Sequence, residues 1–264
     1  QCPAITFVGH DLHFLRTQGE YDLSGDSSLL KQVEEWRKRE LSVIDAVDHT
    51  VYFSEVEVQT LAEILPTRDI RSIPLYILED KALDRRLDEI PQLLFVAGFN
   101  HPPNIDAACW FVSEVLPLIE KTVGSVHLHI AGSNPNKAVQ ELASHNITVH
   151  GYVSDEALLD LYSTSHCAVV PLRFGAGVKG KVLEAIQYGV PLVTTHVGAE
   201  GIPDYQKVMA VSDDPLSFAK AVAENVREAN YPTSAAAFAD RANWLNTHFS
   251  AQNAERAIAC LIDG

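Results

Sequence analysis

Short apolar runs alternate with longer amphipathic stretches along the chain from Gln92 onward. The runs are rich in β-branched residues, whereas the stretches between them repeat their apolar positions every three to four residues, as helices do. This alternation is typical of a doubly wound parallel sheet with helices on both faces, an α/β fold of the Rossmann-like type. The strands that it predicts are 93–97, 126–131, 147–150, 168–171, 192–195 and 208–211.

Residues at the ends of the amphipathic stretches support their assignment as helices. Ser154 and Asp214 are typical N-cap residues, and Asn104 precedes another apolar-periodic stretch. Gly189, followed by Pro191, ends a predicted helix. Local signals and hydrophobic pattern therefore predict the same elements.

The N-terminal part of the chain shows fewer strands. We expect a strand at 4–8, a long helix at about 29–47, a short strand at 50–53 and then another helix. Ser54 with Glu57 predicts a capping box at the start of that last helix. Two strands do not form a stable sheet by themselves, so we expect that upstream sequence has been lost.

Three segments follow from these patterns. Residues 1–78 are expected to be the end of an N-terminal domain with its linker, and residues 79–231 a Rossmann-like domain. Residues 232–264 are expected to form helices that pack back towards the N-terminal part. The proline-flanked stretch 71–91 is the predicted connection between the domains.

Composition and charge narrow the range of functions. The chain has 264 residues, of which 47% are hydrophobic, and no apolar run approaches the roughly 20 residues that span a bilayer, so we expect a soluble protein. The formal net charge of −15 disfavours nonspecific binding to nucleic acid or anionic lipid but is compatible with one basic pocket for a phosphate. The four cysteines are widely separated and predict neither a zinc site nor a disulfide framework.

The segment 171–191, PLRFGAGVKGKVLEAIQYGVP, carries the densest chemical signal. A buried strand is followed by a glycine-rich loop, and then by a helix that contains Lys181 and Glu184. Glycines let the backbone approach a ligand closely, and the amides and dipole at a helix start favour phosphate oxygens. Lys181 adds a cation, and Glu184 can accept hydrogen bonds from ribose hydroxyls. The segment predicts a nucleoside diphosphate site; the alternative is a flexible loop before an ordinary surface helix.

Other familiar site patterns are weak. The chain has neither a Walker A motif nor GxGxxG, which disfavours a P-loop NTPase and a dinucleotide dehydrogenase. His10 and His13 flank two residues, a spacing that could chelate a metal ion. Because two imidazoles alone more often pack or cap a turn, we predict no metal site.

Three stretches resemble one known family. They are FVAGFNHPPNIDAACWFVSEVLPLI (95–119), HGYVSDEALLDLYSTSHCAVVPL (150–172) and GVKGKVLEAIQYGVPLVTTHVGAEGI (177–202). In order and spacing they are similar to the second domain of the retaining glycosyltransferases of family 4, which have the two-domain GT-B architecture. The residues before them resemble only the end of that family's N-terminal domain, truncated upstream.

The resemblance implies roles for individual residues. Glu184 matches the second Glu of the family's Glu-x7-Glu motif, which binds the donor ribose, whereas Ala176 replaces the first Glu and leaves the sugar preference open. Lys181 resembles the cation that binds phosphate and supports catalysis, and His10 resembles a strand-end His that faces the donor sugar. The other donor-binding positions that it implies are Gly98, Asn100, Tyr152, Gly175, Gly177, Val178 and Glu200.

These residues together predict a glycosyltransferase that moves a sugar from a nucleotide diphosphate sugar to an unidentified glycan, lipid or small-molecule acceptor. The resemblance implies retention of configuration, and we expect the fragment alone to turn over poorly. Lys181 and the amides would stabilise the leaving diphosphate, so no metal or other cofactor is expected. We expect no nucleic-acid partner, and a location in the cytoplasm or at the inner face of the membrane. The alternatives are a degenerate, noncatalytic nucleotide-binding module, suggested by Ala176, and a nucleotide-sugar epimerase.

Overall fold

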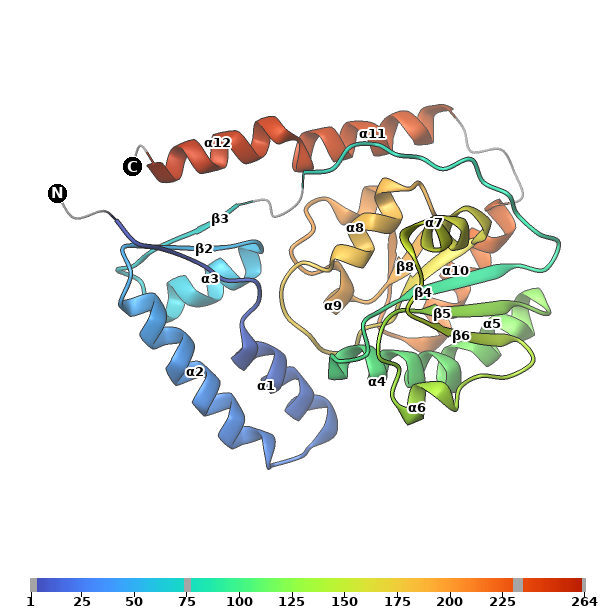
Figure 1. The fold of residues 1–264 in the computed structure, drawn as a ribbon, viewed down its shortest axis with the longest axis horizontal. Helices are drawn as coiled ribbons and strands as arrows, with labels where there is room; N and C mark the ends of the chain where they lie inside the picture. Colours follow the sequence, from blue (N-terminus) through green and yellow to red (C-terminus); the bar gives the residue numbers. More distant parts are fainter. Residues whose placement is uncertain (1–3, 74–76, 230–234, 263–264) are drawn as a thin grey trace.

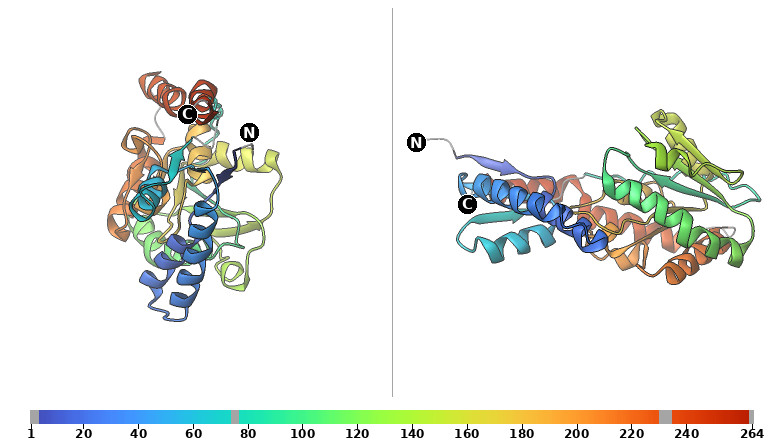
Figure 2. Two further views of the ribbon diagram at one scale, coloured as in Figure 1. Left: turned by 90° about the vertical axis from the view of Figure 1, so that its left-hand side faces the viewer. Right: turned by 90° about the horizontal axis from the view of Figure 1, so that it is seen from below.

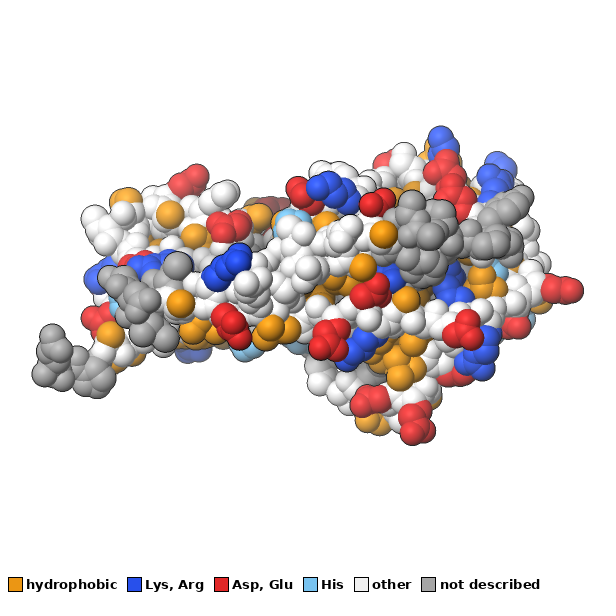
Figure 3. All heavy atoms as spheres, turned by 90° about the horizontal axis from the view of Figure 1, so that it is seen from above, with side chains coloured by type: hydrophobic (Ala, Val, Ile, Leu, Met, Phe, Trp, Pro, Cys, Tyr) orange, Lys and Arg blue, Asp and Glu red, His pale blue; other side chains and the backbone are white. Residues whose placement is uncertain are grey.

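The protein contains two parallel sheets that lie side by side in an elongated molecule (Figures 1 and 2). A computed structural model describes residues 4–73, 77–229 and 235–262. The smaller sheet has three strands and the larger, the main sheet, has six. Acidic and basic side chains are interspersed on the face seen in Figure 3, so the net negative charge does not gather into one patch there.

The main sheet has the strand order β6-β5-β4-β7-β8-β9, and all its pairs are parallel. This confirms the predicted doubly wound sheet, although the strand ends differ by a residue or two from the predicted ones. β9 is shorter than predicted, because residues 208–209, which were expected to begin it, come directly after the 3-10 helix η2 (Tyr205–Lys207) and lie outside the strand. The strands are β4 (Gln92–Val96), β5 (His127–Ala131), β6 (Ile147–Gly151), β7 (Cys167–Val170), β8 (Leu192–Thr194) and β9 (Ala210–Val211).

Helices pack against this sheet around one large apolar core. Phe218 of α10 is fully buried, and its ring lies edge-on to the rings of Trp110 and Phe111 at centroid distances of 6.1 and 6.0 Å. The helices are α4 (Pro102–Trp110), η1 (Phe111–Val115), α5 (Leu116–Val123), α6 (Lys137–Gln140), α7 (Asp155–Thr164), α8 (Gly180–Gln187), α9 (His196–Ala199), η2 (Tyr205–Lys207) and α10 (Pro215–Ala229).

Most of the predicted helix ends are confirmed. The Ser154 hydroxyl accepts a hydrogen bond from the amide of Ala157, and the Asp214 carboxylate accepts one from the amide of Ser217. Gly189 ends α8 with a left-handed backbone, which glycine adopts without strain. The helix expected after Asn104 begins earlier, at Pro102, so Asn104 lies within its first turn.

The smaller sheet contains three parallel strands rather than the two that the sequence predicted. They are β1 (Thr6–Val8), β2 (His49–Tyr52) and β3 (Asp69–Ser72). β3 overlaps the start of the predicted connection. The helices of this N-terminal part are α1 (His13–Ser24), α2 (Leu29–Asp45) and α3 (Glu55–Ile64), of which α1 was not predicted.

Two distant carboxylates cap α1. Glu57 of α3 accepts a hydrogen bond from the Leu12 amide at 2.7 Å, and Glu40 of α2 accepts bonds from the amides of His13 and Phe14 at 2.8 and 3.1 Å. The predicted capping box is therefore wrong in one half. The Ser54 hydroxyl does cap α3, through the amide of Val56, but Glu57 reaches across to α1 instead.

The C-terminal helices α11 (Ala235–Phe249) and α12 (Ala251–Ile262) run from the main sheet towards the smaller one (Figures 1 and 2). Trp244 of α11 is buried, and its indole N–H donates to the carbonyl of Pro203 at 3.0 Å. The amide of Leu78 donates to the carbonyl of Phe249, so the extended connection is tied to the same helix. The predicted boundary between residues 231 and 232 lies outside the described residues. In the described part of the chain, no helix has the length and apolar character to cross a membrane.

Candidate functional site

In the main sheet, the order in which the chain adds strands reverses between β4 and β7. These strands are neighbours, and the remaining strands follow outward from them on either side. The loops 97–101 and 171–179 therefore lead to opposite sides of the sheet and leave a crevice at the carboxyl ends of the strands, where ligands bind in such folds. A cleft of about 250 Å³ lies at this place. The predicted site residues that line it are His10, Gly175, Val178 and Lys181.

Lys181 is the central cation of this cleft. It lies in the first turn of α8, and its Nζ donates to Oδ1 of Asn104 at 2.6 Å and lies 5.2 Å from the centre of the Phe95 ring. Burial, with a smaller contribution from the neighbouring charge of Lys179, lowers the pKa of Lys181 to about 7. The two groups that contact Nζ, the Asn104 amide and the Phe95 ring, are both neutral, so neither of them neutralises the positive charge of Lys181.

Asn104 holds the two sides of the cleft together. While its Oδ1 accepts from Lys181, its Nδ2 donates to the carbonyl of Gly98 at 2.7 Å. Gly98 belongs to the turn after β4, so one amide side chain fixes this turn against the start of α8. The sequence singled out Gly98 and Lys181 but did not predict that Asn104 joins them.

Two helices start at the cleft without an acidic cap. Neither α4 nor α8 has a side-chain cap or an acidic residue in its first turn. At α8 the first amides and the positive end of the helix dipole therefore stay available to an anion. α4 contributes its dipole but few amides, because it begins with two prolines, which have no N–H, and the next amide, that of Asn104, donates to the carbonyl of His101. Gly177 lets the loop before α8 pass close to the N-terminal part, because a Cβ there would lie 2.9 Å from the backbone oxygen of His10.

Lys179, beside Lys181, has a different environment that the sequence did not predict. Lys179 is almost buried, and its Nζ donates to the carbonyl of Gly177. Burial lowers the pKa of Lys179, while the carboxylates of Glu200, Glu57 and Asp11 oppose that shift. Burial also raises the pKa of Glu57 to about 8. Lys179 therefore belongs to an internal charge cluster between the two sheets.

Glu184 lies behind the cleft rather than in its lining. Its carboxylate accepts a hydrogen bond from the hydroxyl of Tyr162 at 2.9 Å, and burial raises its pKa. Tyr162, on α7, is fully buried. The bond orients the Glu184 carboxylate one turn of α8 away from Lys181 and leaves its second oxygen as an acceptor.

The structure does not bring every predicted residue into this cavity. Tyr152 follows β6 with 79% of its surface exposed, and Asn100 is exposed in the turn after β4. Glu200 accepts a hydrogen bond from the Gly177 amide at 3.1 Å, which places its carboxylate beside the loop that lines the cleft. Its side chain borders a second cavity.

His10 and His13 do not form a common site. His10 lines the cleft, whereas the Nδ1 of His13 pairs with Glu40 at 2.9 Å and its ring stacks on Trp36 at 4.4 Å. Among the residues that the structure describes, no group of three or more potential ligands could hold a metal ion.

Comparison with known proteins identifies the family. The family model described as "Glycosyl transferases group 1" matches residues 90–228, more than half of the chain. The chain belongs to this family. A relative from Klebsiella pneumoniae, described as an uncharacterized 44.6 kDa protein in the cps region, is 29% identical over 136 residues, which are 48% of this chain and 35% of that protein.

Solved structures confirm the GT-B fold of this group 1 glycosyltransferase chain. Sucrose-phosphate synthase from Thermosynechococcus elongatus has a TM-score of 0.75 at 16% identity, over 98% of this chain and 67% of that one. TarM from S. aureus, solved with fondaparinux, α-GlcNAc-glycerol and UDP, has a TM-score of 0.69 at 13% identity, over 87% of this chain and 47% of that one. The chain therefore spans about a third of its curated relative and about half of TarM.

The family match covers both loops of the cleft but not the whole cavity. The loops 97–101 and 171–179 lie inside the matched region, whereas His10, Asp11 and Arg16 lie outside it. Arg16 donates to Asp11 within the cleft, so its charge is already paired. The group 1 glycosyltransferase core thus supplies the cation and the helix starts, and the N-terminal part supplies the opposite wall.

Proposed function

We propose that this chain carries the donor site of a glycosyltransferase that uses a nucleoside diphosphate sugar and retains the anomeric configuration. The observation that carries the proposal is Lys181, placed between two helix starts at the point where the sheet changes direction. A half-buried lysine whose Nζ bonds to a neutral amide, beside the uncapped start of α8, suits a diphosphate. TarM was solved with UDP, and another similar structure is a trehalose-phosphate synthase described as UDP-forming, which makes UDP the first ligand to test.

Five of the predicted residues have a proposed part in this site. Lys181 and the amides at the start of α8 bind the diphosphate, and Gly98 lets the backbone pass beneath it. Glu184 accepts hydrogen bonds from the ribose hydroxyls through the oxygen that Tyr162 leaves available. Tyr152 borders the nucleobase, and His10 faces the donor sugar from the opposite wall.

The proposed reaction exchanges one bond at the anomeric carbon. The bond from this carbon to the diphosphate oxygen breaks, and the electron pair stays on the diphosphate. The acceptor hydroxyl oxygen forms the new bond on the same face, and its proton passes to the departing diphosphate. Lys181 and the helix starts stabilise the negative charge that develops there, so the proposal assigns this role to the chain's own groups rather than to a metal ion. The acceptor, the donor sugar and the expected cytoplasmic location stay predictions.

Calorimetric titration with UDP and with GDP tests this proposal. Lys181→Ala should weaken binding of the preferred nucleotide about tenfold or more, which corresponds to about 1.4 kcal/mol or more. Lys207→Ala is the matched control, because Lys207 is exposed, pairs with Asp204 and does not line the cleft. Equal affinities in the two variants, or no binding of either nucleotide by the folded wild-type chain, would contradict the donor site.

A further inference from the structure

The loop between β7 and α8 carries the start of α8 to the donor cleft. Residues 175–179, here called the glycine loop, include Gly175 and Gly177 with φ angles of 153° and 72°. Both angles lie in the region that favours glycine, and glycine adopts many backbone conformations at little cost. The amides at the start of α8 can therefore meet a phosphate in one arrangement only if other contacts hold the loop.

Lys179 fills the inside of the glycine loop. A Cβ on Gly175 would lie 3.4 Å from Cε of Lys179, and the Nζ of Lys179 donates to the carbonyl of Gly177. The backbone of the same residue begins the helix, because the Lys179 carbonyl accepts from the amide of Val182 at 2.9 Å. One residue thus joins the middle of the loop to the first turn of α8.

Glu200 holds Gly177 from the other side. Its carboxylate accepts from the Gly177 amide at 3.1 Å, so both polar backbone groups of this glycine are bonded to side chains. Burial raises the pKa of Glu200, and the positive charge of Lys179 opposes that rise. Burial lowers the pKa of Lys179, and Glu200 is the strongest of the charges that oppose this shift. The two side chains stabilise each other in the charged form, with Gly177 between them.

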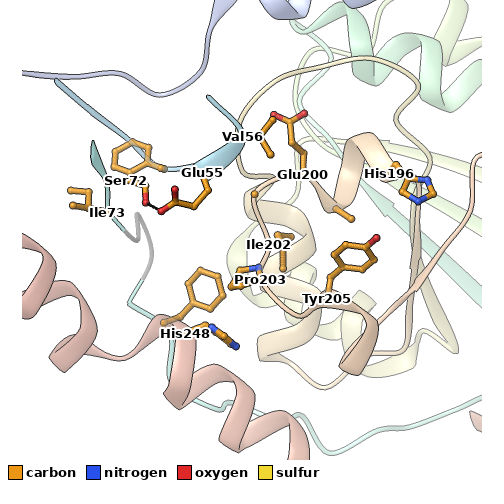
Figure 4. Close-up of a pocket in the computed structure, with 14 residues that line it drawn as sticks. Glu55, Val56, Ser72, Ile73, His196, Glu200, Ile202, Pro203, Tyr205 and His248 are labelled. Carbon is orange, nitrogen blue, oxygen red and sulfur yellow. Dashed lines mark hydrogen bonds between the residues drawn. The ribbon is translucent and has the colours of Figure 1, made fainter. Parts of the chain in front are cut away.

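Glu200 reaches the glycine loop from a fixed segment. It follows α9 and lies between the loop and a second cavity of about 560 Å³, and Figure 4 shows its carboxylate on the side of that cavity away from Tyr205 and His248. The Thr195 hydroxyl, which caps α9, donates to the carbonyl of Leu172. The segment that carries Glu200 is therefore tied to the segment that leads into the glycine loop.

The two lysines at the cleft have different surroundings, although both line it. The Nζ of Lys181 contacts a neutral amide and an aromatic ring. The charge of Lys179 is compensated by three carboxylates, those of Glu200, Glu57 and Asp11. A diphosphate would gain little attraction from a cation that is already compensated. Lys181 therefore suits ligand binding, and Lys179 suits a task within the loop.

We propose that Lys179 and Glu200 are positioning residues, which hold Gly177 between them and so fix the glycine loop in the shape that presents the start of α8 to the donor diphosphate. They act through the backbone of Gly177 rather than by contact with the ligand. The identity of the ligand rests on the proposed function, whereas the role in the loop rests on the contacts alone. Glu200 thus has a positioning role in place of the donor contact that the family resemblance implied.

Hydrogen-exchange mass spectrometry of the unliganded chain tests the loop itself. Glu200→Gln keeps a side-chain oxygen for the Gly177 amide, whereas Glu200→Met removes it. We expect exchange in peptides that cover residues 175–184 to become about tenfold faster in Glu200→Met and to stay within about twofold of wild type in Glu200→Gln, with β5 unchanged in both. Wild-type exchange in Glu200→Met, or faster exchange throughout the chain, would contradict the role of Glu200 in the loop.

UDP titration of the same variants tests the link to binding. Affinity should fall about tenfold in Glu200→Met, because the loop must then be ordered on binding, and should stay within about twofold of wild type in Glu200→Gln. Glu224→Met controls for the loss of a negative charge, because Glu224 is exposed on α10 and does not line the cleft, and it should bind as wild type does. Simple charge repulsion predicts the opposite sign, because loss of an acid would strengthen UDP binding. Tighter binding in Glu200→Met, or an equal loss in the two Glu200 variants, would overturn the positioning role.

Lys179→Met separates positioning from direct contact with the ligand. Because both side chains act through Gly177, this change should weaken UDP binding about tenfold in the wild-type chain but less than about twofold in the Glu200→Met chain. A direct contact between Lys179 and the diphosphate predicts the same loss in both chains, and that result would show that Lys179 is a ligand-binding residue instead.

The two measurements distinguish failure of this inference from failure of the proposed function. If the wild-type chain binds UDP but Glu200→Met matches it in exchange and in affinity, the positioning role is wrong and the donor site stands. If the wild-type chain binds no UDP but the glycine loop exchanges faster in Glu200→Met and not in Glu200→Gln, the side chains hold the loop and the donor site is wrong.

Discussion

The residues just before α1 and the start of α8 both line the cleft that contains Lys181, but only the start of α1 is closed by side chains. At α1, three amides donate to the carboxylates of Glu40 and Glu57. At α8, no side chain caps the helix, no acid lies in its first turn, and Lys181 adds a positive charge. The first helix start is used to hold the fold together, and the second is open at the place where we propose that the diphosphate binds.

This difference shows how similar helix dipoles serve two purposes. A carboxylate at a helix start satisfies unpaired amides and stabilises the helix. Where the acid is absent and the start lies at the carboxyl ends of parallel strands, the same amides remain available to a phosphate. We therefore expect that removing the acids affects mainly stability, and that adding an acid at the cleft affects mainly binding.

The largest effect is expected from Glu40→Ala. The variant loses the acceptors for the amides of His13 and Phe14 and the partner of the His13 ring, so the free energy of unfolding should fall by about 3 kcal/mol in urea denaturation. Glu35→Ala is the control on the same helix, because its exposed pair with Lys31 should contribute less than about 0.5 kcal/mol. Equal losses in both variants would show that α1 is not held by Glu40.

A smaller effect is expected from Asn104→Asp, which adds a carboxylate beside Lys181 at the uncapped start of α8. The new acid would pair with Lys181 and repel the diphosphate, so the affinity for UDP should fall about tenfold, or about 1.4 kcal/mol. Asn136→Asp makes the same change of charge at the cap of α6 and should leave the affinity unchanged. A similar loss in both variants would indicate a general effect of net charge rather than a site at Lys181.

The smallest effect is expected from pH. Because the pKa of Lys181 in the free protein is lowered to about 7, the lysine loses its positive charge as the pH rises above that value. Raising the pH from about 7 to about 8 should therefore weaken UDP binding about fivefold, roughly 1 kcal/mol. Lys181→Arg, which stays charged, should bind UDP with an affinity that does not change over this interval. A wild-type affinity that also stays constant would contradict the role of Lys181.

The main sheet could be predicted from the sequence because its signals are local. Each strand is a short buried run, and caps such as Ser154 and Asp214 lie next to the helices that they start. Helix α1 was missed because its N-cap position is Leu12, which has no capping side chain. β3 was missed because its sequence, DIRS, contains two charged residues and its side chains are only half-buried.

In the candidate site, too, only the residues with local sequence signals could be predicted. Lys181 and Gly98 could be singled out from neighbouring residues and the family resemblance, but Asn104 joins them across 77 positions, a contact that only the sheet order determines. The charge cluster of Lys179, Glu57 and Glu200 was missed for the same reason, because its members come from segments beside different sheets that are far apart in the sequence. Long-range pairing of polar groups leaves no periodic trace in a sequence.

Hydrogen-exchange mass spectrometry of the chain with and without saturating UDP tests the central claim most directly, because it reports which amides the nucleotide protects. The account predicts slower exchange in peptides that cover the turn after β4, residues 97–104, and the loop and first turn of α8, residues 175–184. It predicts no change at the start of α1, where Glu40 and Glu57 already hold the amides. Protection at α1 or around the second cavity, with none at the start of α8, would contradict the donor site.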